Sequence, residues 1–367
     1  MSEKIICIEA KKLKNFMKDV FIRLNVPKED AEICADVLIV SDLRGIESHG
    51  IQRMKMYYDR IKAGIYNPKT EIKIIKESPT TAVIDGGLGM GHIIAYKSMK
   101  LAIEKAKKYG LGAVAVRNST HFGIAGYYSL MAIKEGMIGI AVTNTRPSVP
   151  PTSGVEPILG TNPLTAGCPT DEDFPFLIDC ATSIIQRGKV EVYNRLKKTL
   201  PKGLVINNKD ESEIDPTKIL NNLGNNTAAL LSFGKKGEEN GGHKGYGYAT
   251  LVEILSSALQ DGIYLKDTAG IEVDGKKYLK VGHFFLAINI ENFIPLDTFR
   301  KITGNIMKGL RNSKKAPGCD KIYTAGEKEF EAEMERCKTG IPINEDLQQD
   351  IKIMQEELGI KHYNFPF

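Results

Sequence analysis

The side chains best suited to chemistry stand in the segment DLRGIESHGIQRM, which carries Ser48, His49 and Arg53. A histidine titrates near neutral pH and can take the proton of an alcohol. A guanidinium can hold a carboxylate through two parallel hydrogen bonds. His49 and Arg53 are four residues apart and would share one face if a helix begins here. The segment suits oxidation of a hydroxy acid. It equally suits a capping loop, with Ser48 as N-cap and His49 at the surface.

A second histidine, His121, follows the apolar run LGAVAVRN, which predicts a buried strand. Ligands of α/β sheets bind where strands end. His121 is therefore a second candidate for proton transfer, and the alternative is a hydrogen-bonded histidine of the core.

Two more segments carry polar groups next to predicted strands and turns. The first runs from ILGTNPL to LIDCATSIIQRGK and holds Asn162, Asp179, Ser183 and Lys189. The second is GGHKGYG, in which glycines flank Lys244 and would let a phosphate approach the backbone. The alternatives are a helix cap for Asp179 and a flexible loop around Lys244.

The elements that must position these groups alternate in type after an all-helical start. Apolar spacing predicts helices over 9–24, from Pro27 to Leu43, and over 50–64. Strands are then expected in TTAVIDG, LGAVAVRN, MIGIAVTNT, FPFLIDCAT and HFFLAINI, with helices between several of them, one of which is SIIQRGKVEVYNRLKK. Residues 146–164 are rich in Pro, Gly, Ser and Thr and predict a loop. The tail, over 296–315 and 328–358, is again helical. This alternation predicts α/β layering.

The glycine-rich turn IDGGLGMGH does not meet the requirements of a dinucleotide-binding turn. Gly87 and Gly89 match the first two glycines of the pattern, but His92 stands at the third position. The next strand also ends without the acidic residue that would bind the ribose hydroxyls. A tight turn into a helix is the better interpretation.

Composition narrows the class of protein further. The 367 residues carry a net charge of +5 without a basic stripe, which disfavours a nucleic-acid partner. Six cysteines form no CxxC pair, which favours reduced thiols and a cytoplasmic location. The sequence has no signal peptide and no run near the ~20 apolar residues of a membrane span, so no membrane contact is expected.

Taken in order, seven phrases resemble the type-2 malate/L-lactate dehydrogenase family: DLRGIESHGIQRM, AVIDGGLGMGH, AVRNSTHFGIAGYY, IGIAVTNTRP, ILGTNPL, DCATS with RGK, and GGHKGYG. The resemblance covers nearly the whole chain. It implies an α/β, non-Rossmann fold like that of L-sulfolactate dehydrogenase, with helical N- and C-terminal parts. It also implies a homodimer with its active site near the subunit interface, an NAD or NADP cofactor with NAD slightly favoured, and no metal.

The resemblance implies roles for individual residues. His49 looks like the proton donor and acceptor, with His121 second for that role, and Asp179 is similar to a residue treated as catalytic in an imine reductase of the family. Ser48, Arg53 and Asn162 would bind the substrate. The cofactor contacts would be Asp179, Cys180, Ala181, Thr182, Ser183, Lys189, His243, Lys244, Gly326, Glu327 and Lys328.

Three positions depart from the family pattern. The sequence has PPTSG where the family has Pro-Phe-Gly-Gly, Cys180 where it has methionine, and His243 where it has proline. His243 follows the charged stretch FGKKGEEN. This departure leaves the preference for NAD or NADP open.

We therefore expect an NAD(P)-dependent oxidoreductase that interconverts a 2-hydroxy acid and a 2-keto acid, with malate and oxaloacetate favoured. The alternatives are a sulfolactate, lactate or ureidoglycolate dehydrogenase, an imine reductase, or a non-catalytic NAD(P)-binding protein. Malate needs a second anion site, for which Arg146 in TNTRP is a candidate and a surface arginine the alternative. The expected domains are 1–75 with 310–367, which are helical, and 76–309, which binds cofactor and substrate either as one unit or as two subdomains divided near 140.

Overall fold

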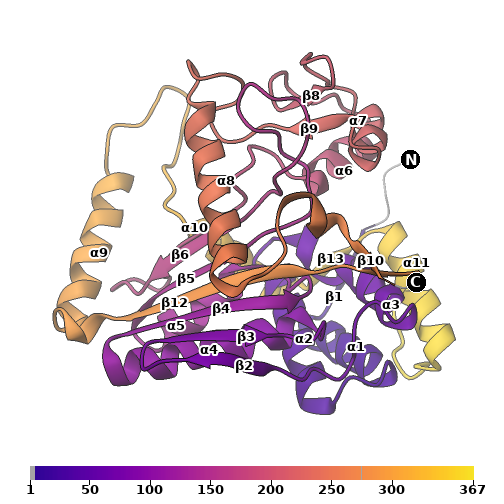
Figure 1. Cartoon of the computed structure of the whole chain (residues 1–367), viewed down its shortest axis with the longest axis horizontal. Helices are drawn as coiled ribbons and strands as arrows, with labels where there is room; N and C mark the ends of the chain where they lie inside the picture. Colours follow the sequence, from indigo (N-terminus) through magenta and orange to yellow (C-terminus); the bar gives the residue numbers. More distant parts are fainter. Residues whose placement is uncertain (1–4, 274) are drawn as a thin grey trace.

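The computed structural model describes residues 5–273 and 275–367, and its centre is a seven-stranded sheet (Figure 1). The strands lie in the order β2-β3-β4-β12-β5-β6-β7. Their bounds are β2 Lys73–Glu77, β3 Thr81–Asp85, β4 Leu111–Ser119, β12 Val281–Asn289, β5 Met137–Thr143, β6 Leu164–Cys168 and β7 Phe176–Cys180. Only β3 and β4 pair in parallel; the other neighbours are antiparallel. The α/β fold is confirmed, and the mainly antiparallel pairing differs from a Rossmann sheet.

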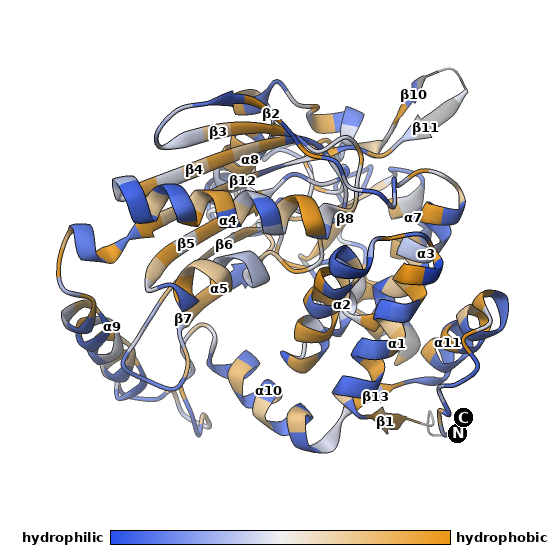
Figure 2. Cartoon of the chain, turned by 90° about the horizontal axis from the view of Figure 1, so that it is seen from below, coloured by the Kyte–Doolittle hydropathy of each residue, from blue (hydrophilic) through white to orange (hydrophobic). Residues whose placement is uncertain are grey.

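Helices cover both faces of this sheet. Helices α4 (Gly91–Tyr109) and α5 (Gly126–Lys134) lie across one face, which Figure 2 shows from below, and α8 (Gly242–Ser257) lies on the other. Alanines of α4 pack on the buried valines of β4. At Gly112 in β4, a Cβ atom would stand 1.9 Å from the carbonyl oxygen of Ala102. This close packing fixes the position of β4 relative to α4. His121 follows two residues after the end of β4.

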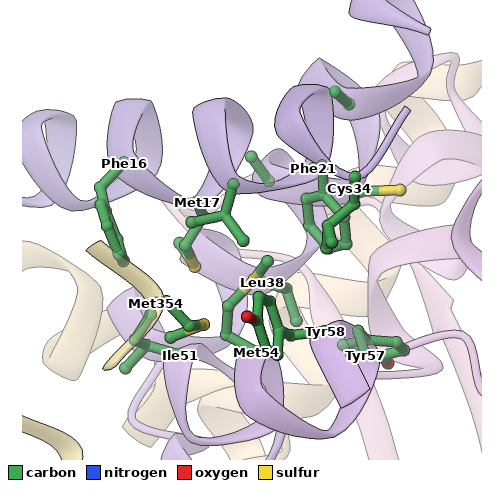
Figure 3. Packing of buried hydrophobic residues seen from close by; sticks show 14 of the residues in the cluster. Phe16, Met17, Phe21, Cys34, Leu38, Ile51, Met54, Tyr57, Tyr58 and Met354 are labelled. Carbon is green, nitrogen blue, oxygen red and sulfur yellow. The ribbon is translucent and has the colours of Figure 1, made fainter. Parts of the chain in front are cut away.

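A helical layer joins the two ends of the chain. Helices α1 (Ala10–Arg23), α2 (Lys28–Leu43) and α3 (Met54–Lys62) pack with α11 (Glu345–Leu358), and β1 (Ile6–Ile8) pairs antiparallel with β13 (Ile341–Ile343). Figure 3 shows their shared core, in which Phe16, Met17 and Leu38 meet Met54 and Met354. Tyr57 and Tyr58 of α3 also belong to this core, which therefore fixes α3 next to the site described below. How the chain divides into domains stays a prediction.

A smaller lobe has its own core. It consists of α6 (Arg187–Arg195), α7 (Pro216–Gly224), β8 (Val205–Asn207) and β9 (Ala228–Leu230), packed around Val190, Ile219 and Leu230. The remaining elements are the hairpin β10 (Ile271–Val273) and β11 (Lys276–Tyr278), and the short 3-10 turns η3 Ala258–Gln260, η4 Leu265–Ala269 and η5 Ile290–Asn292.

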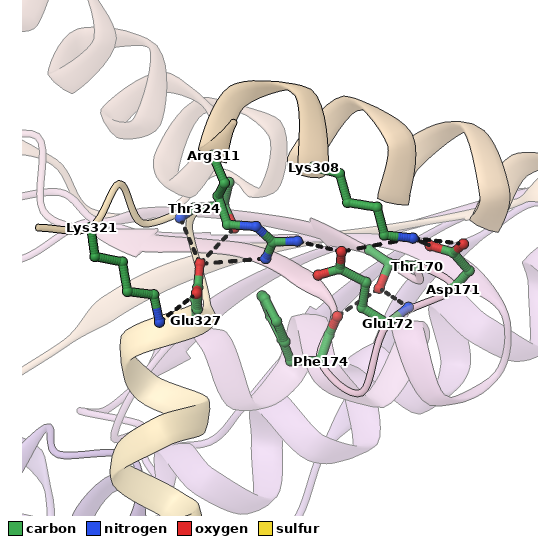
Figure 4. Close-up of polar contacts among 9 residues, drawn as sticks. All are labelled: Thr170, Asp171, Glu172, Phe174, Lys308, Arg311, Lys321, Thr324 and Glu327. Carbon is green, nitrogen blue, oxygen red and sulfur yellow. Dashed lines mark hydrogen bonds and ion pairs between the residues drawn. The ribbon is translucent and has the colours of Figure 1, made fainter. Parts of the chain in front are cut away.

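An ion network holds α9 (Leu296–Arg311) and α10 (Glu327–Thr339) to the loop before β7. Arg311 bonds Glu172 and approaches Glu327 at 3.5 Å, and Lys308 binds Asp171 at 3.1 Å (Figure 4). Lys321 adds an ion pair of 2.9 Å to Glu327. Because Glu327 is buried, its carboxylate needs these partners.

Three expected helices differ from the structure at their boundaries. The helix expected over 50–64 begins only at Met54, after the 3-10 turns η1 (Glu47–His49) and η2 (Ile51–Arg53), so His49 and Arg53 do not share an α-helical face. Helix α6 begins at Arg187 because residues before it run extended, with Ser183 bridged to Ser232. The helix expected over 328–358 is interrupted after Thr339. Gly340 adopts a φ of +87°, and β13 follows before α11 begins. None of the described helices is long and apolar enough to cross a membrane.

Candidate active site

The two candidate histidines meet where the helical layer touches the sheet. His49 ends η1, and His121 stands two residues beyond β4. Their imidazole rings stack with centroids 5.6 Å apart and planes inclined by 22°. Two segments more than seventy residues apart in the sequence thus place their imidazole rings side by side.

Backbone and side-chain contacts fix the position of His49. Its Nδ1 is 2.8 Å from Ser48 Oγ, and Arg53 Nε donates to the Ser48 carbonyl oxygen at 2.7 Å. The buried carboxyl group of Asp42 accepts the Ile51 N–H at 2.8 Å and so anchors the turn that follows. Among the described residues, none hydrogen-bonds Nε2 of His49, which leaves that nitrogen for a ligand.

Contacts to a single ring nitrogen fix His121. Its Nδ1 hydrogen-bonds the hydroxyl group of Tyr57 and also accepts the backbone N–H of Gly123 at 3.4 Å. The Tyr57 side chain is fully buried. Within the part of the chain that the structure describes, Nε2 of His121 has no hydrogen-bond partner.

Burial keeps both imidazoles neutral. Desolvation and, to a smaller extent, the Arg53 guanidinium together lower the pKa of His49 to about 4. Burial also lowers the pKa of His121 well below 6.5, with added repulsion from His49, Arg53, His92 and Arg60. Each ring is therefore ready to act as a neutral donor or acceptor at neutral pH.

Four arginines form a group that reaches this pair, because two of them, Arg53 and Arg60, lie close enough to His121 to lower its pKa. Burial lowers the pKa of Arg146, and the positive charges of Arg187, Arg60 and Arg53 lower it further. The Arg146 side chain is nonetheless exposed to solvent, as expected for a group lining an open space rather than packed in a core. Arg187 begins α6, and a Cβ at the next residue, Gly188, would lie 3.1 Å from Cβ of Ser48. Arg187 pairs with Glu191 at 3.1 Å, whereas Arg53, Arg60 and Arg146 form no ion pair with the described residues. Like charges gather only at a cost unless an anion compensates them, so the cluster is a candidate anion site.

Asp179 is placed as a cap rather than as a group that faces the histidines. Its carboxylate accepts Gly126 N–H at 2.8 Å, at the first residue of α5, and Thr165 Oγ1 at 2.7 Å. A Cβ at Gly126 would stand 2.5 Å from the carboxylate, so only glycine fits. Asp179 thus holds the helix that begins five residues after His121.

Asn162 is also committed to the protein. It is fully buried and accepts Thr145 N–H at 3.1 Å, while its Nδ2 donates to Glu253 at 2.8 Å and to the Ala249 carbonyl oxygen at 3.0 Å. All the groups that could bind a substrate are occupied, so direct contact between this side chain and the substrate stays a prediction without structural support.

The segment Cys180–Ser183 leads from the end of β7 toward α6. Cys180 ends β7 and is partly buried, while Ala181, Thr182 and Ser183 are buried. Thr182 Oγ1 donates to the carbonyl oxygens of Thr161 and Asn162, and Ser183 Oγ donates to that of Ile185. Their side chains are therefore engaged internally. Lys189, in the first turn of α6, is exposed.

The other predicted cofactor residues lie on two helix starts. His243 and Lys244 are exposed in the first turn of α8, which packs on Phe233, and Phe233 N–H bonds the Thr182 carbonyl oxygen at 3.0 Å. Gly326 caps α10 with a φ of +94°, and Lys328 Nζ lies 4.8 Å from the Tyr323 ring centroid. Glu327 is taken up by the ion network of Figure 4.

Sequence reasoning missed three residues of this site. Asp42 opens the very segment that carries His49, but nothing in the sequence shows that it folds back on Ile51. Tyr57 lies four residues after Arg53, a helical spacing that was available as a signal. His92 packs against Tyr57 with ring centroids 4.6 Å apart, and its position depends on a long-range contact that no local pattern predicts.

Known proteins resemble this chain over nearly its whole length. The family model for malate/L-lactate dehydrogenase matches residues 8–352. A malate dehydrogenase of Pyrococcus abyssi is 46% identical over 361 residues, which cover 98% of this chain and 97% of the relative. An L-sulfolactate dehydrogenase of Methanocaldococcus jannaschii is 41% identical over 349 residues, covering 95% and 96%.

A solved structure of a malate dehydrogenase has the same fold. The crystal structure of malate dehydrogenase from Entamoeba histolytica matches with a TM-score of 0.94 and 44% identity, over 99% of this chain and 100% of that one. The predicted resemblance and the enzyme class, a dehydrogenase acting on hydroxy acids, are thereby confirmed: the chain belongs to the malate/L-lactate dehydrogenase family.

Proposed function

We propose that this enzyme interconverts malate and oxaloacetate with NAD or NADP. The observation that carries the proposal is the group of four arginines, Arg53, Arg60, Arg146 and Arg187, of which Arg53 and Arg60 lie close enough to His121 to lower its pKa. A substrate with a carboxylate at each end would neutralise more of this charge than a monocarboxylate such as lactate. The malate dehydrogenases among the relatives support the same choice.

In this account each side chain has one task. Only the Nε of Arg53 donates a hydrogen bond to the described part of the protein, so its two Nη groups can hold the C1 carboxylate. Arg146 would hold the distal carboxylate. His49 takes the hydroxyl proton at Nε2 as the C2–H hydride leaves, and the C2–O bond becomes a carbonyl. The nicotinamide, when bound, supplies or accepts that hydride.

The residues that could hold the cofactor fit its phosphates. Helices α6 and α8 both begin near the Cys180–Ser183 segment, and each has an exposed lysine, Lys189 or Lys244, in its first turn. Helix N-termini with nearby cations are general phosphate sites. NAD is slightly favoured over NADP, and we propose a cytoplasmic enzyme because all six cysteines are free thiols.

We also propose a homodimer formed across α8 and α9. Ile302, Ile306 and Leu310 follow a four-residue spacing along α9 and are 51%, 59% and 55% exposed, whereas Met307 on its other side is buried. Tyr248, Leu251 and Ile254 form a similar exposed row on α8. Figure 1 shows α9 at one edge of the molecule, where a second copy can reach it. Light scattering should give a dimer, and Ile306→Glu a monomer. Ile75→Glu, at an exposed isoleucine on β2, should stay dimeric; a monomeric wild type would refute the proposal.

The function is tested by following the loss of NADH or NADPH absorbance after adding oxaloacetate, pyruvate or sulfopyruvate. The proposal predicts the highest kcat/KM with oxaloacetate, with pyruvate roughly 10- to 100-fold lower, the value of one charge-assisted contact. A preference for sulfopyruvate would establish a sulfolactate dehydrogenase instead. Folded protein that turns over no keto acid or cyclic imine with either cofactor would leave the non-catalytic NAD(P)-binding alternative.

A further inference from the structure

The contacts of His121 determine which of its nitrogens carries a proton. The Gly123 backbone N–H can only donate, and it points at Nδ1. A proton on Nδ1 would therefore face another N–H. Nδ1 must be the unprotonated acceptor nitrogen, and in the neutral ring the proton then sits on Nε2.

Tyr57 completes this arrangement. Because Nδ1 has no proton to give, the Tyr57 hydroxyl must be the donor in the hydrogen bond between them. The Tyr57 side chain is 0% exposed and packs between Phe21 and His92, with ring centroids 6.3 and 4.6 Å away. Both nitrogens of His92 lack a partner among the described residues, so His92 does not compete for the hydroxyl group. The hydroxyl group of Tyr57 is committed to His121.

From this geometry we propose that Tyr57 is a positioning residue, which holds His121 as the Nε2–H tautomer so that His121 donates a hydrogen bond to the C2 oxygen of the substrate. This inference rests on the proposed hydroxy-acid chemistry. It assigns the two stacked rings different tasks. His121 is a neutral donor that stabilises negative charge on the oxygen, and His49 alone takes the proton.

The proton and electron count agrees with this division. In oxidation, the hydroxyl proton passes to His49 Nε2, the C2–H bond breaks as hydride leaves for the nicotinamide, and the C2–O bond gains its second bond. His121 keeps its own proton throughout. In the reverse direction His121 polarises the keto group while protonated His49 returns the proton. A preorganised donor at a developing oxyanion typically contributes about 10²- to 10³-fold in rate.

Nitrogen-15 NMR of the six labelled histidine rings tests the tautomer directly, because protonated and unprotonated ring nitrogens resonate far apart. The His121 signals are assigned by their loss in His121→Gln. We expect wild type to show the proton on Nε2, and Tyr57→Phe to show averaging between tautomers with about a fivefold lower kcat, the value of one ordinary hydrogen bond. Tyr58→Phe is the matched control, since its hydroxyl group bonds Glu357, and it should leave the His121 signals unchanged. A proton on Nδ1 in wild type would overturn the proposal.

Turnover separates donor from base. The amide group of glutamine can place N–H where Nε2–H stood, but it cannot accept a proton at neutral pH. We expect His121→Gln to stay within about tenfold of wild type and His121→Ala to lose about 10²- to 10³-fold. Equal losses in both variants would contradict the donor role. The NMR result needs no substrate, so it stands or falls separately from the proposed malate chemistry.

Discussion

The carboxyl group of Asp42 fills the space beside Gly50, so that a Cβ at residue 50 would lie 1.9 Å from Oδ1 of Asp42. The same group accepts the Ile51 N–H at 2.8 Å. One buried acid therefore sets the backbone on the C-terminal side of His49 and excludes every residue but glycine at position 50. The position of the proposed proton acceptor depends on this contact inside the helical layer.

Asp42 should make stability fall as pH rises. Burial raises its pKa from 3.8 to about 8, so the folded protein keeps a proton that the unfolded chain loses above about pH 4. Between these values the folded state binds more protons, and the free energy of unfolding decreases with rising pH. Asp42→Asn keeps an acceptor for Ile51 and should remove this part of the slope, whereas Asp42→Ala should also lose stability at pH 5. Denaturant unfolding from pH 5 to 9 measures the effect; parallel curves for wild type and Asp42→Asn would contradict it.

Arg146 should select substrates by their second anion. Replacing it with glutamine removes the proposed contact to the distal carboxylate, so kcat/KM for oxaloacetate should fall by about 10- to 100-fold. Pyruvate lacks that carboxylate and should lose less than threefold. Arg117→Gln is a suitable control because Arg117 pairs with Asp85 on the sheet, at 3.0 Å. Steady-state kinetics with both acceptors decides the matter, and an unchanged KM for oxaloacetate would eliminate Arg146 from the site.

Two other buried histidines, His92 and His283, should respond to mutation in opposite ways. Burial lowers the pKa values of His92 and His283 to about 3, so each costs stability as pH falls below about 6.5, where the unfolded chain takes up protons. His283 bonds Thr143 at 2.8 Å and Ser119 at 2.7 Å, whereas both His92 nitrogens lack partners among the described residues.

His283→Met should therefore cost about 1–3 kcal/mol at pH 8 by removing two buried hydrogen bonds. His92→Met should cost little or stabilise the protein at pH 8, and it should reduce the loss of stability toward pH 5. Urea unfolding at these two pH values provides the comparison. The reasoning is wrong if His92→Met proves the more damaging change at pH 8.

The sequence predicted what local patterns encode. Apolar spacing located α1, β3, β4, β5 and β12, and the segment around His49 was identified as the centre of the chemistry. Local patterns cannot show that β12 enters between β4 and β5, because that pairing joins residues more than one hundred positions apart. Local patterns also could not bring Tyr57 to His121, 64 positions away, or show that Asp42 accepts the N–H of Ile51. The internal hydrogen bonds of Asn162 were equally hidden, since its polarity alone suggested a substrate contact.

The most direct test of the whole account is the turnover of His49→Ala with oxaloacetate, together with its affinity for the cofactor. We predict that kcat falls by about 10²- to 10⁴-fold, the value of a positioned acid–base group, while the cofactor Kd stays within a factor of about three. A variant that keeps wild-type turnover would show that His49 does not carry the proton, and the assignment would pass to His121.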